Sequence, residues 1–136
     1  MSTYKIATIP GDGIGKEVVP EGIRVLDAVG RKHNIKFQWD MFDWSCETYK
    51  KTGRMMPEDG IYQTSEHDAI YLGAVGFPGV PDHISLWGLL IPFRREYQQY
   101  VNLRPVRLFK GVPSPLANRE PGDIDFYVVR ENVEGE

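Results

Sequence analysis

The sequence predicts an α/β fold, a layered and largely parallel sheet with helices on its faces. Two observations predict it. Short runs of apolar and β-branched residues alternate along the chain with stretches whose apolar residues recur at helical spacing. Prolines and glycines separate these segments, and the chain contains no internal repeat or low-complexity stretch.

The first third of the chain predicts a strand, a helix and a second strand. Residues 4–9 form a short run with β-branched side chains that halts at Pro10, as a buried strand does. Apolar residues recur at helical spacing between 14 and 29, and Pro20 should either kink this helix or mark its true start. Residues 35–44 alternate between apolar and polar side chains, which is typical of a strand with one covered face.

The later segments continue the alternation. A helical stretch precedes a third short strand at residues 68–73. Residues 86–100 have the spacing of a helix, although Pro92 limits where that helix can begin. Two more strands, 101–109 and 125–130, flank a loop rich in proline and glycine.

Composition and charge exclude several classes of protein. The net charge of −3 argues against nucleic-acid binding, which needs a basic face. Cys46 is the only cysteine, so we expect no disulfide, a reducing compartment and a small core residue rather than a nucleophile. The apolar run near the N-terminus is too short for a signal peptide or a membrane span, and we expect a cytoplasmic protein.

A glycine-rich loop follows the first predicted strand and has the sequence GDGIG at residues 11–15. Glycines there allow a helix N-terminus to approach an anion or a cofactor closely. The dinucleotide fingerprint is G-x-G-x-x-G, and here the third glycine comes one residue early. The acidic residue expected about twenty positions later also fits poorly, because Asp27 is early and Asp40 is late. A purely structural tight turn is an equally good interpretation.

Basic residues are concentrated between 94 and 119. Six cations stand there against the single acid Glu96, so the segment carries +5 in a chain of net −3. Arginine suits bidentate recognition of carboxylates or phosphates. We expect Arg94 and Arg104 to converge on such an anion, since one lies on a predicted helix and the other on the next strand. A solvated surface position is expected for Arg95, Arg107 and Lys110.

Other titratable residues give weaker signals. His67 and His83 are predicted to serve a turn or a cap rather than acid–base chemistry, because neither has a paired carboxylate or hydroxyl in its sequence surroundings. Glu131 and Glu134 supply two carboxylates but no third ligand, which is weak evidence for a metal site.

Four motifs in the same order resemble the isocitrate/isopropylmalate dehydrogenase family. They are IPGDGIGKEV at 9–18, GAVG at 73–76, NLRP at 102–105 and VRENVEGE at 129–136. Within the family, DHISLWG at 82–88 looks most like the tartrate/D-malate branch, as does FRREY at 93–97. Isopropylmalate enzymes usually carry a glutamate near Trp87, and its absence counts against that branch.

The resemblance implies an NAD-dependent oxidative decarboxylation of a 2-hydroxy dicarboxylate such as (R)-malate or tartrate. The implied cofactors are NAD and Mn²⁺ or Mg²⁺, with K⁺ as a further candidate, and the implied assembly is a homodimer with shared active sites. The implied site residues fall into three groups. They are Arg94, Arg104 and Arg130 for the substrate carboxylates, Ile14, Gly73, Ala74, Val75 and Gly76 for the cofactor side, and Ser85, Trp87 and Leu90 for substrate specificity.

The resemblance also implies how the chain is organised. Residues 1–100 would be the N-terminal part of the cofactor-side α/β domain, and 101–136 the start of a central substrate and dimerisation domain. The family's catalytic tyrosine, catalytic lysine and metal-binding aspartates would all lie beyond Glu136. We therefore expect a fragment with an incomplete fold, with no catalytic or metal-binding residue of its own and no turnover by itself.

Three alternatives to this interpretation remain open from the sequence. One is an isopropylmalate dehydrogenase, and another is a non-catalytic module that binds a nucleotide or an anion through the glycine loop and the basic segment. The third is a regulatory subunit that pairs with an active homologue. The sequence does not decide among (R)-malate, tartrate and related acids as substrate.

Overall fold

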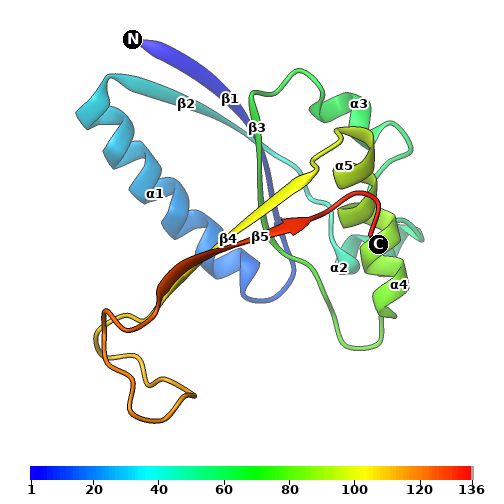
Figure 1. The fold of residues 1–136 in the computed structure, drawn as a ribbon. Helices are drawn as coiled ribbons and strands as arrows, with labels where there is room; N and C mark the ends of the chain where they lie inside the picture. Colours follow the sequence, from blue (N-terminus) through cyan, green and yellow to red (C-terminus); the bar gives the residue numbers. More distant parts are fainter. Residues whose placement is uncertain (136) are drawn as a thin grey trace. The chain divides into compact units, whose positions relative to one another are not determined.

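The computed structural model describes residues 1–135, which form two compact units (Figure 1). The first is Met1–Phe93 and the second is the described part of Arg94–Glu136. Glu136, the last residue of the 129–136 motif, lies outside the described residues.

The first unit contains a three-stranded parallel sheet in the order β2-β1-β3. Its strands are β1 (Ser2–Gly11), β2 (Ile35–Met41) and β3 (Ala69–Ala74). Ile6 of the central strand lies opposite Trp39 on one side and Ala69 on the other. The run from Ile6 to Ile9 is buried throughout, as expected for a parallel strand that is covered on both faces. The predicted α/β class with a parallel sheet is confirmed.

Helix α1 (Gly15–His33) packs against all three strands. The predicted helix is confirmed, but Val18, Val25 and Val29 are exposed, whereas Val19 and Gly30 are buried. The side facing the sheet therefore includes glycine, which the apolar spacing did not indicate. A Cβ on Gly30 would lie 2.7 Å from the carbonyl oxygen of Ile35, so glycine allows the helix backbone to approach the start of β2 closely.

Pro20 does not mark the start of α1, because the helix begins five residues earlier. Proline removes the N–H that would bind the carbonyl of Lys16, four residues before it. Pro20 is exposed, so water can reach this part of the helix and bind the carbonyl that lacks its helical donor. The first turns of α1 therefore tolerate a proline inside the helix.

Two short helices, α2 (Cys46–Thr52) and α3 (Gly60–Thr64), connect β2 to β3. The hydroxyl of Ser45 caps α2 by accepting the backbone N–H of Thr48 at 3.1 Å. Trp44, just before α2, packs on Phe42 with ring centroids 4.5 Å apart, and stacks on Phe93 at 6.2 Å. These rings anchor the α2 region within the first unit.

The last helical stretch differs from the predicted helix at 86–100. It runs from Asp82 to Glu96 as α4 (Asp82–Ser85), the π turn η1 (Leu86–Leu90) and α5 (Ile91–Glu96). The N–H of Ile91 binds the carbonyl of Leu86, five residues back, immediately before Pro92. In an α-helix the ring of Pro92 would clash with the carbonyl four residues earlier, and a wider turn relieves that clash. Pro92 therefore lies inside the helical stretch and does not limit its start.

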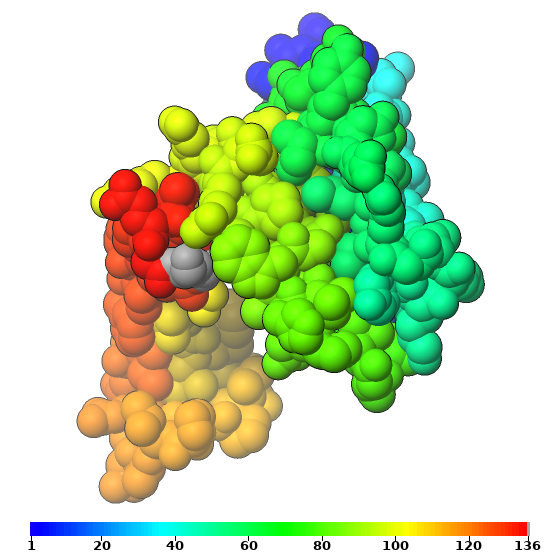
Figure 2. All heavy atoms as spheres, turned by 90° about the vertical axis from the view of Figure 1, so that its right-hand side faces the viewer, coloured from blue at the N-terminus to red at the C-terminus, as the bar shows by residue number. Residues whose placement is uncertain are grey.

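The second unit is built on an antiparallel pair, β4 (Val101–Arg107) and β5 (Asp125–Glu131). Asn102 lies opposite Arg130, and Arg107 lies opposite Asp125, with which it forms an ion pair at 2.6 Å. The proline- and glycine-rich segment 108–124 connects the strands as a loop at one end of the pair (Figures 1 and 2). The parallel arrangement is thus confined to the sheet of the first unit.

Candidate functional site

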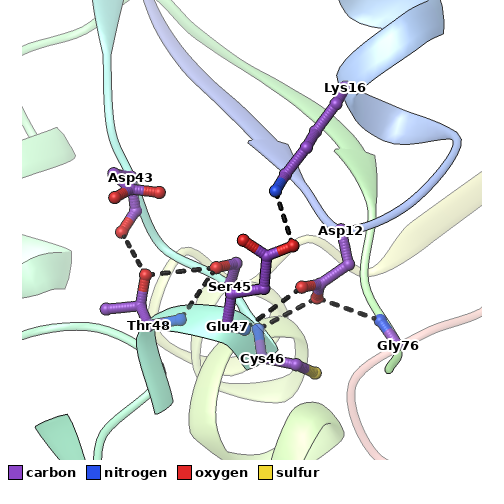
Figure 3. Close-up of polar contacts among 8 residues, drawn as sticks. All are labelled: Asp12, Lys16, Asp43, Ser45, Cys46, Glu47, Thr48 and Gly76. Atoms are coloured by element: carbon purple, nitrogen blue, oxygen red, sulfur yellow. Dashed lines mark hydrogen bonds and ion pairs between the residues drawn. The ribbon is translucent and has the colours of Figure 1, made fainter. Parts of the chain in front are cut away.

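Asp12 connects three segments at the end of β1. Only 1% of this residue is exposed, and its carboxylate accepts the backbone N–H groups of Cys46 at 2.9 Å, Glu47 at 3.2 Å and Gly76 at 3.3 Å (Figure 3). The first two donors open α2, and the third lies in the loop after β3. The carboxylate therefore fixes the glycine loop, 11–15, to the loop 73–76 and to α2. Sequence reasoning missed this role, because the partners are 34 to 64 residues away.

The glycine loop and the 73–76 loop pack backbone to backbone. Gly11 has a φ of 74°, and a Cβ built on it would lie 2.0 Å from the carbonyl oxygen of Ala74. A Cβ on Gly73 would lie 2.2 Å from the carbonyl oxygen of Pro10. The backbone N–H of Asp12 also donates to the carbonyl of Ala74 at 2.6 Å. These contacts support the interpretation of a structural tight turn.

The same two loops leave part of their surface open. Ile14 is 59% exposed, and a Cβ added to Gly13 or Gly76 would meet nothing within 4 Å. Backbone at these two glycines is accessible to a ligand, while Asp12 holds it from behind. Ile14 and the 73–76 loop, which were expected on the cofactor side, are thus joined in the first unit through Asp12.

Cys46 is fully buried beside the Asp12 carboxylate. Burial and then the nearby carboxylate raise the pKa of its thiol to about 11. A thiol with that pKa is almost entirely protonated at neutral pH and is a poor nucleophile. The environment is that of the small core residue expected from the sequence.

Arg104 and Arg130 lie on one face of the β4–β5 pair. Arg130 is directly opposite Asn102, and Arg104 follows Asn102 by two residues on the same strand. Side chains opposite each other, or two apart along a strand, point to the same face of an antiparallel pair. The two arginines are therefore diagonal neighbours, which places two guanidinium groups within reach of one small dianion.

Two asparagines contact these arginines, and sequence reasoning gave them no role. Nε of Arg104 donates to Oδ1 of Asn102 at 3.3 Å, and Nη2 of Arg130 donates to Oδ1 of Asn132 at 3.4 Å. Nε of Arg130 also donates to the carbonyl of Glu131 at 3.3 Å. The available signal was the amide placed two residues from an arginine in both the 102–105 and 129–136 motifs.

The other basic residues of the 94–119 segment have different surroundings. Arg94 is half-buried in the last turn of α5, and its carbonyl accepts the backbone N–H of Gln99 at 2.8 Å. Arg95, Arg107 and Lys110 are exposed. The charge of Arg107 is paired with Asp125 on the opposite face of the strand pair from Arg104.

The expected specificity residues do not share one environment. Ser85 is buried, and its hydroxyl donates to the carbonyl of Asp82 at 3.0 Å inside the helical stretch. Trp87 is 52% exposed and Leu90 is half-buried. Trp87 lines a surface hollow of about 450 Å³ together with other residues of the first unit. These are Tyr49, Gly53, Arg54, Met55, Met56, His83, Ile84 and Gly88.

His67 and Glu131 hold local backbone structure. Nδ1 of His67 lies 3.3 Å from the carbonyl of Thr64, and Nε2 lies 3.0 Å from the carboxylate of Asp40 in β2. His67 therefore fastens the turn before β3, as expected. Glu131 accepts the backbone N–H of Glu134 at 2.8 Å and those of Val133 and Gly135, and these bonds lower its pKa.

The described residues do not fit a metal site. Within 1–135, no group of three or more His, Cys, Asp or Glu side chains is arranged to hold a metal ion. The carboxylate of Glu131 is already engaged by backbone donors. None of the helices in this part of the chain combines the length and the apolar character needed to span a membrane.

The comparison with known families decides the relationship. A sequence profile described as isocitrate/isopropylmalate dehydrogenase matches residues 5–136. The chain belongs to this family. The resemblance found in the four motifs is confirmed, and the family's fold accounts for the parallel sheet flanked by helices.

Relatives within the isocitrate/isopropylmalate dehydrogenase family are decarboxylating enzymes. The D-malate dehydrogenase (decarboxylating) of Escherichia coli (strain K12) is 64% identical, with 100% of this chain and 38% of the relative covered. The tartrate dehydrogenase/decarboxylase of Pseudomonas putida is 62% identical, with 98% and 37% covered. The resemblance to the tartrate/D-malate branch is thus confirmed. The chain spans 38% or less of the length of these two family members.

Solved structures agree with the fold. The β-decarboxylating dehydrogenase from Thermococcus kodakarensis is 30% identical with a TM-score of 0.64, and the match covers 97% of this chain and 35% of that one. A protein from Thermus thermophilus is 31% identical with a TM-score of 0.67, covering 95% and 24%.

Proposed function

We propose that the protein carrying this chain is an NAD-dependent decarboxylating dehydrogenase of a 2-hydroxy dicarboxylate such as (R)-malate or tartrate. The observation that carries the proposal is the placement of Arg104 and Arg130 on one face of the β4–β5 pair. The high identity to D-malate and tartrate dehydrogenases supports it. No specific observation favours a binding module or a regulatory subunit.

The arginines supply binding and orientation in this proposal. Arg104 and Arg130 each offer a planar fork of N–H donors that matches a carboxylate, and Arg94 would provide a third. Two fixed carboxylates hold C2 of the substrate in one orientation, which lowers the entropy cost of the transfer step. The contacts with Asn102 and Asn132 orient both guanidinium groups through neutral amides.

The cofactor side of the site would be formed by Ile14 and the 73–76 loop. When bound, NAD supplies the acceptor for the hydride that leaves C2. The accessible backbone at Gly13 and Gly76 fits a ligand that lies flat against the two loops. Asp12 would keep this surface rigid by binding the N–H of Gly76. Mn²⁺ or Mg²⁺, with K⁺ as a further ion, belongs to the proposed reaction, but the described residues supply no ligand set for it.

Specificity would depend on the helical stretch that contains Trp87 and Leu90. Trp87 is the most exposed of the three expected specificity residues, whereas the hydroxyl of Ser85 is already bonded within the helix. π turns occur frequently at functional sites, and η1 contains both Trp87 and Leu90. Ser85 would then act through packing rather than through a substrate hydrogen bond.

The proposal extends to assembly and location. We propose a homodimer in the cytoplasm, supported by a composition with one buried cysteine and no disulfide among the described residues. We also propose that a polypeptide of these 136 residues alone does not turn over substrate, because the family's remaining chemistry would come from residues outside it.

A dehydrogenase assay tests the proposal. NADH formation is measured with NAD, Mn²⁺ and one of (R)-malate, tartrate, isopropylmalate or isocitrate, using the full protein and a separate 136-residue polypeptide. We expect turnover of (R)-malate or tartrate by the full protein only. Turnover of isopropylmalate alone would assign the protein to another branch, and NADH formation by the shorter polypeptide would contradict its inactivity.

A further inference from the structure

We propose that Asn132, together with Asn102, is a positioning residue that holds Arg104 and Arg130 in place for the substrate carboxylates. This inference rests on the proposed function. It concerns residues of the second unit only, and it adds to the arginines a pair of neutral side chains that determine where the guanidinium groups lie.

Asn132 is 6% exposed, and its amide oxygen and nitrogen are both hydrogen-bonded. Its Oδ1 accepts Nη2 of Arg130 at 3.4 Å and Nδ2 of Asn102 at 3.3 Å. Its Nδ2 donates to the carbonyl of Gln99 at 3.3 Å. A buried amide bonded at both ends has a fixed orientation, so the direction from which Arg130 is held is fixed as well.

Asn102 extends the same network to the second arginine. Its Nδ2 donates to Asn132, and its Oδ1 accepts Nε of Arg104 at 3.3 Å. The two guanidinium groups are therefore connected through two amides that face each other across β4 and β5. An arginine side chain loses much conformational freedom when it is ordered, and ordering it before the substrate arrives reduces that cost during binding.

The neutrality of the two amides is the chemical reason for this arrangement. On the opposite face of the strand pair, Arg107 is bound by the carboxylate of Asp125 at 2.6 Å, so its charge is compensated. Arg104 and Arg130 are bound by amide oxygens, which orient a guanidinium group without neutralising it. The asparagines therefore leave the positive charge of these arginines available for a dicarboxylate.

The network also includes the turn that follows α5. The carbonyl of Gln99 accepts Nδ2 of Asn132, and the N–H of Gln99 donates to the carbonyl of Arg94 at 2.8 Å. Gln98 adopts a φ of 48° in this turn, a conformation that side chains other than glycine rarely adopt. Asn132 thus fixes a strained turn on which the backbone position of Arg94 depends.

The test measures substrate and cofactor constants separately in the full protein. Asn132→Ala and Asn102→Ala are compared with wild type and with Gln38→Ala, an exposed amide in the first unit. We expect both asparagine variants to raise the KM for (R)-malate or tartrate about 10-fold. The KM for NAD and the melting temperature of Asn102→Ala should stay near the wild-type values, and Gln38→Ala should match wild type in all three.

A further variant, Asn132→Asp, tests the charge argument. It keeps the size of the side chain but places a carboxylate on Arg130, so it should raise the dicarboxylate KM at least as much as alanine does. Wild-type dicarboxylate KM in Asn102→Ala and Asn132→Asp would overturn the inference, as would a parallel rise in both KM values. If Asn132→Ala does not fold, Asn102→Ala decides.

Arg104→Ala, assayed in parallel, separates this inference from the proposed function. If Arg104→Ala raises the dicarboxylate KM and the asparagine variants do not, only the positioning role is overturned. If the wild-type protein oxidises none of the dicarboxylates, the proposed function fails and the inference fails with it.

Discussion

The backbone N–H of Cys46 donates to the carboxylate of Asp12 at 2.9 Å, although the two residues are 34 positions apart. The same carboxylate binds Gly76 in the loop after β3. One buried acid thereby determines the relative positions of the glycine loop, the start of α2 and the loop expected to face the cofactor.

Replacing Asp12 should destabilise the protein strongly. Asp12→Ala leaves three backbone N–H groups without their charged acceptor, and we expect a loss of about 2–4 kcal/mol in the free energy of unfolding. Asp12→Asn should lose less, because one amide oxygen can still accept. Urea denaturation measures this, with the exposed Asp82→Ala as the control. An unchanged midpoint in Asp12→Ala would refute the role.

The Cys46 thiol should be inert at neutral pH and should affect stability in alkali. Its pKa of about 11 is above the usual 9.0. Because the protonated thiol is favoured in the folded state, stability falls as the pH rises above 9 towards 11, where the unfolded chain loses its proton first. We expect modification of this thiol at pH 7.5 to be about 100-fold slower than that of a free cysteine.

Thiol-reagent kinetics and denaturation curves at about pH 8 and about pH 10.5 measure these effects. Cys46→Ala should lose less stability between the two pH values than wild type does. Rapid labelling of the folded protein near neutral pH would show that the thiol is not protected.

Arg104→Ala should impair substrate binding far more than Arg107→Ala. Removing one of two guanidinium groups leaves a substrate carboxylate without its partner, and we expect a loss of about 2–5 kcal/mol in kcat/KM for the dicarboxylate. Arg107 lies on the same strand, but its charge is paired with Asp125 on the other face, so its removal should have little effect on catalysis. Equal effects of the two substitutions would remove Arg104 from the site.

Glu131 should make the turn that follows β5 sensitive to acid. Hydrogen bonds from the N–H of Glu134, and then from that of Val133, lower the pKa of Glu131 below its usual 4.5. The stabilisation is therefore present above pH 4.5 and is lost as the pH falls through the lowered pKa. Amide hydrogen exchange at residues 133–135, corrected for the intrinsic rate, should increase in that range for wild type, whereas Glu131→Gln should show no such pH dependence. An unchanged exchange rate in wild type would contradict this.

Trp87 should influence substrate choice more than stability. Since 52% of it is exposed, Trp87→Phe should change the free energy of unfolding by less than about 1 kcal/mol. We expect it to change the ratio of kcat/KM for (R)-malate to that for tartrate by about 10-fold. Steady-state kinetics with both acids measure the ratio, and an unaltered ratio would remove Trp87 from the specificity-determining residues.

Local sequence signals predicted the order of strands and helices but not which residues they bury. In α1 the helical period was visible, yet Val19 and Gly30 are buried while Val25 and Val29 are exposed. Hydropathy cannot reveal that a close backbone approach requires glycine at one of these positions. The roles of Asp12 and Asn132 were hidden for another reason. Both depend on partners more than 30 positions away, which only the folded chain brings together.

The π turn before Pro92 is equivalent to one extra residue inserted into an α-helix. Each residue of an α-helix rotates the chain by about 100°, so one insertion turns everything on one side of it relative to the other. A relative without the extra residue would present a different side chain where Trp87 now lies, with the residues after Pro92 unmoved. Single-residue insertions and deletions at 86–91 are therefore a route by which evolution can exchange one acid for another without altering the arginines that follow.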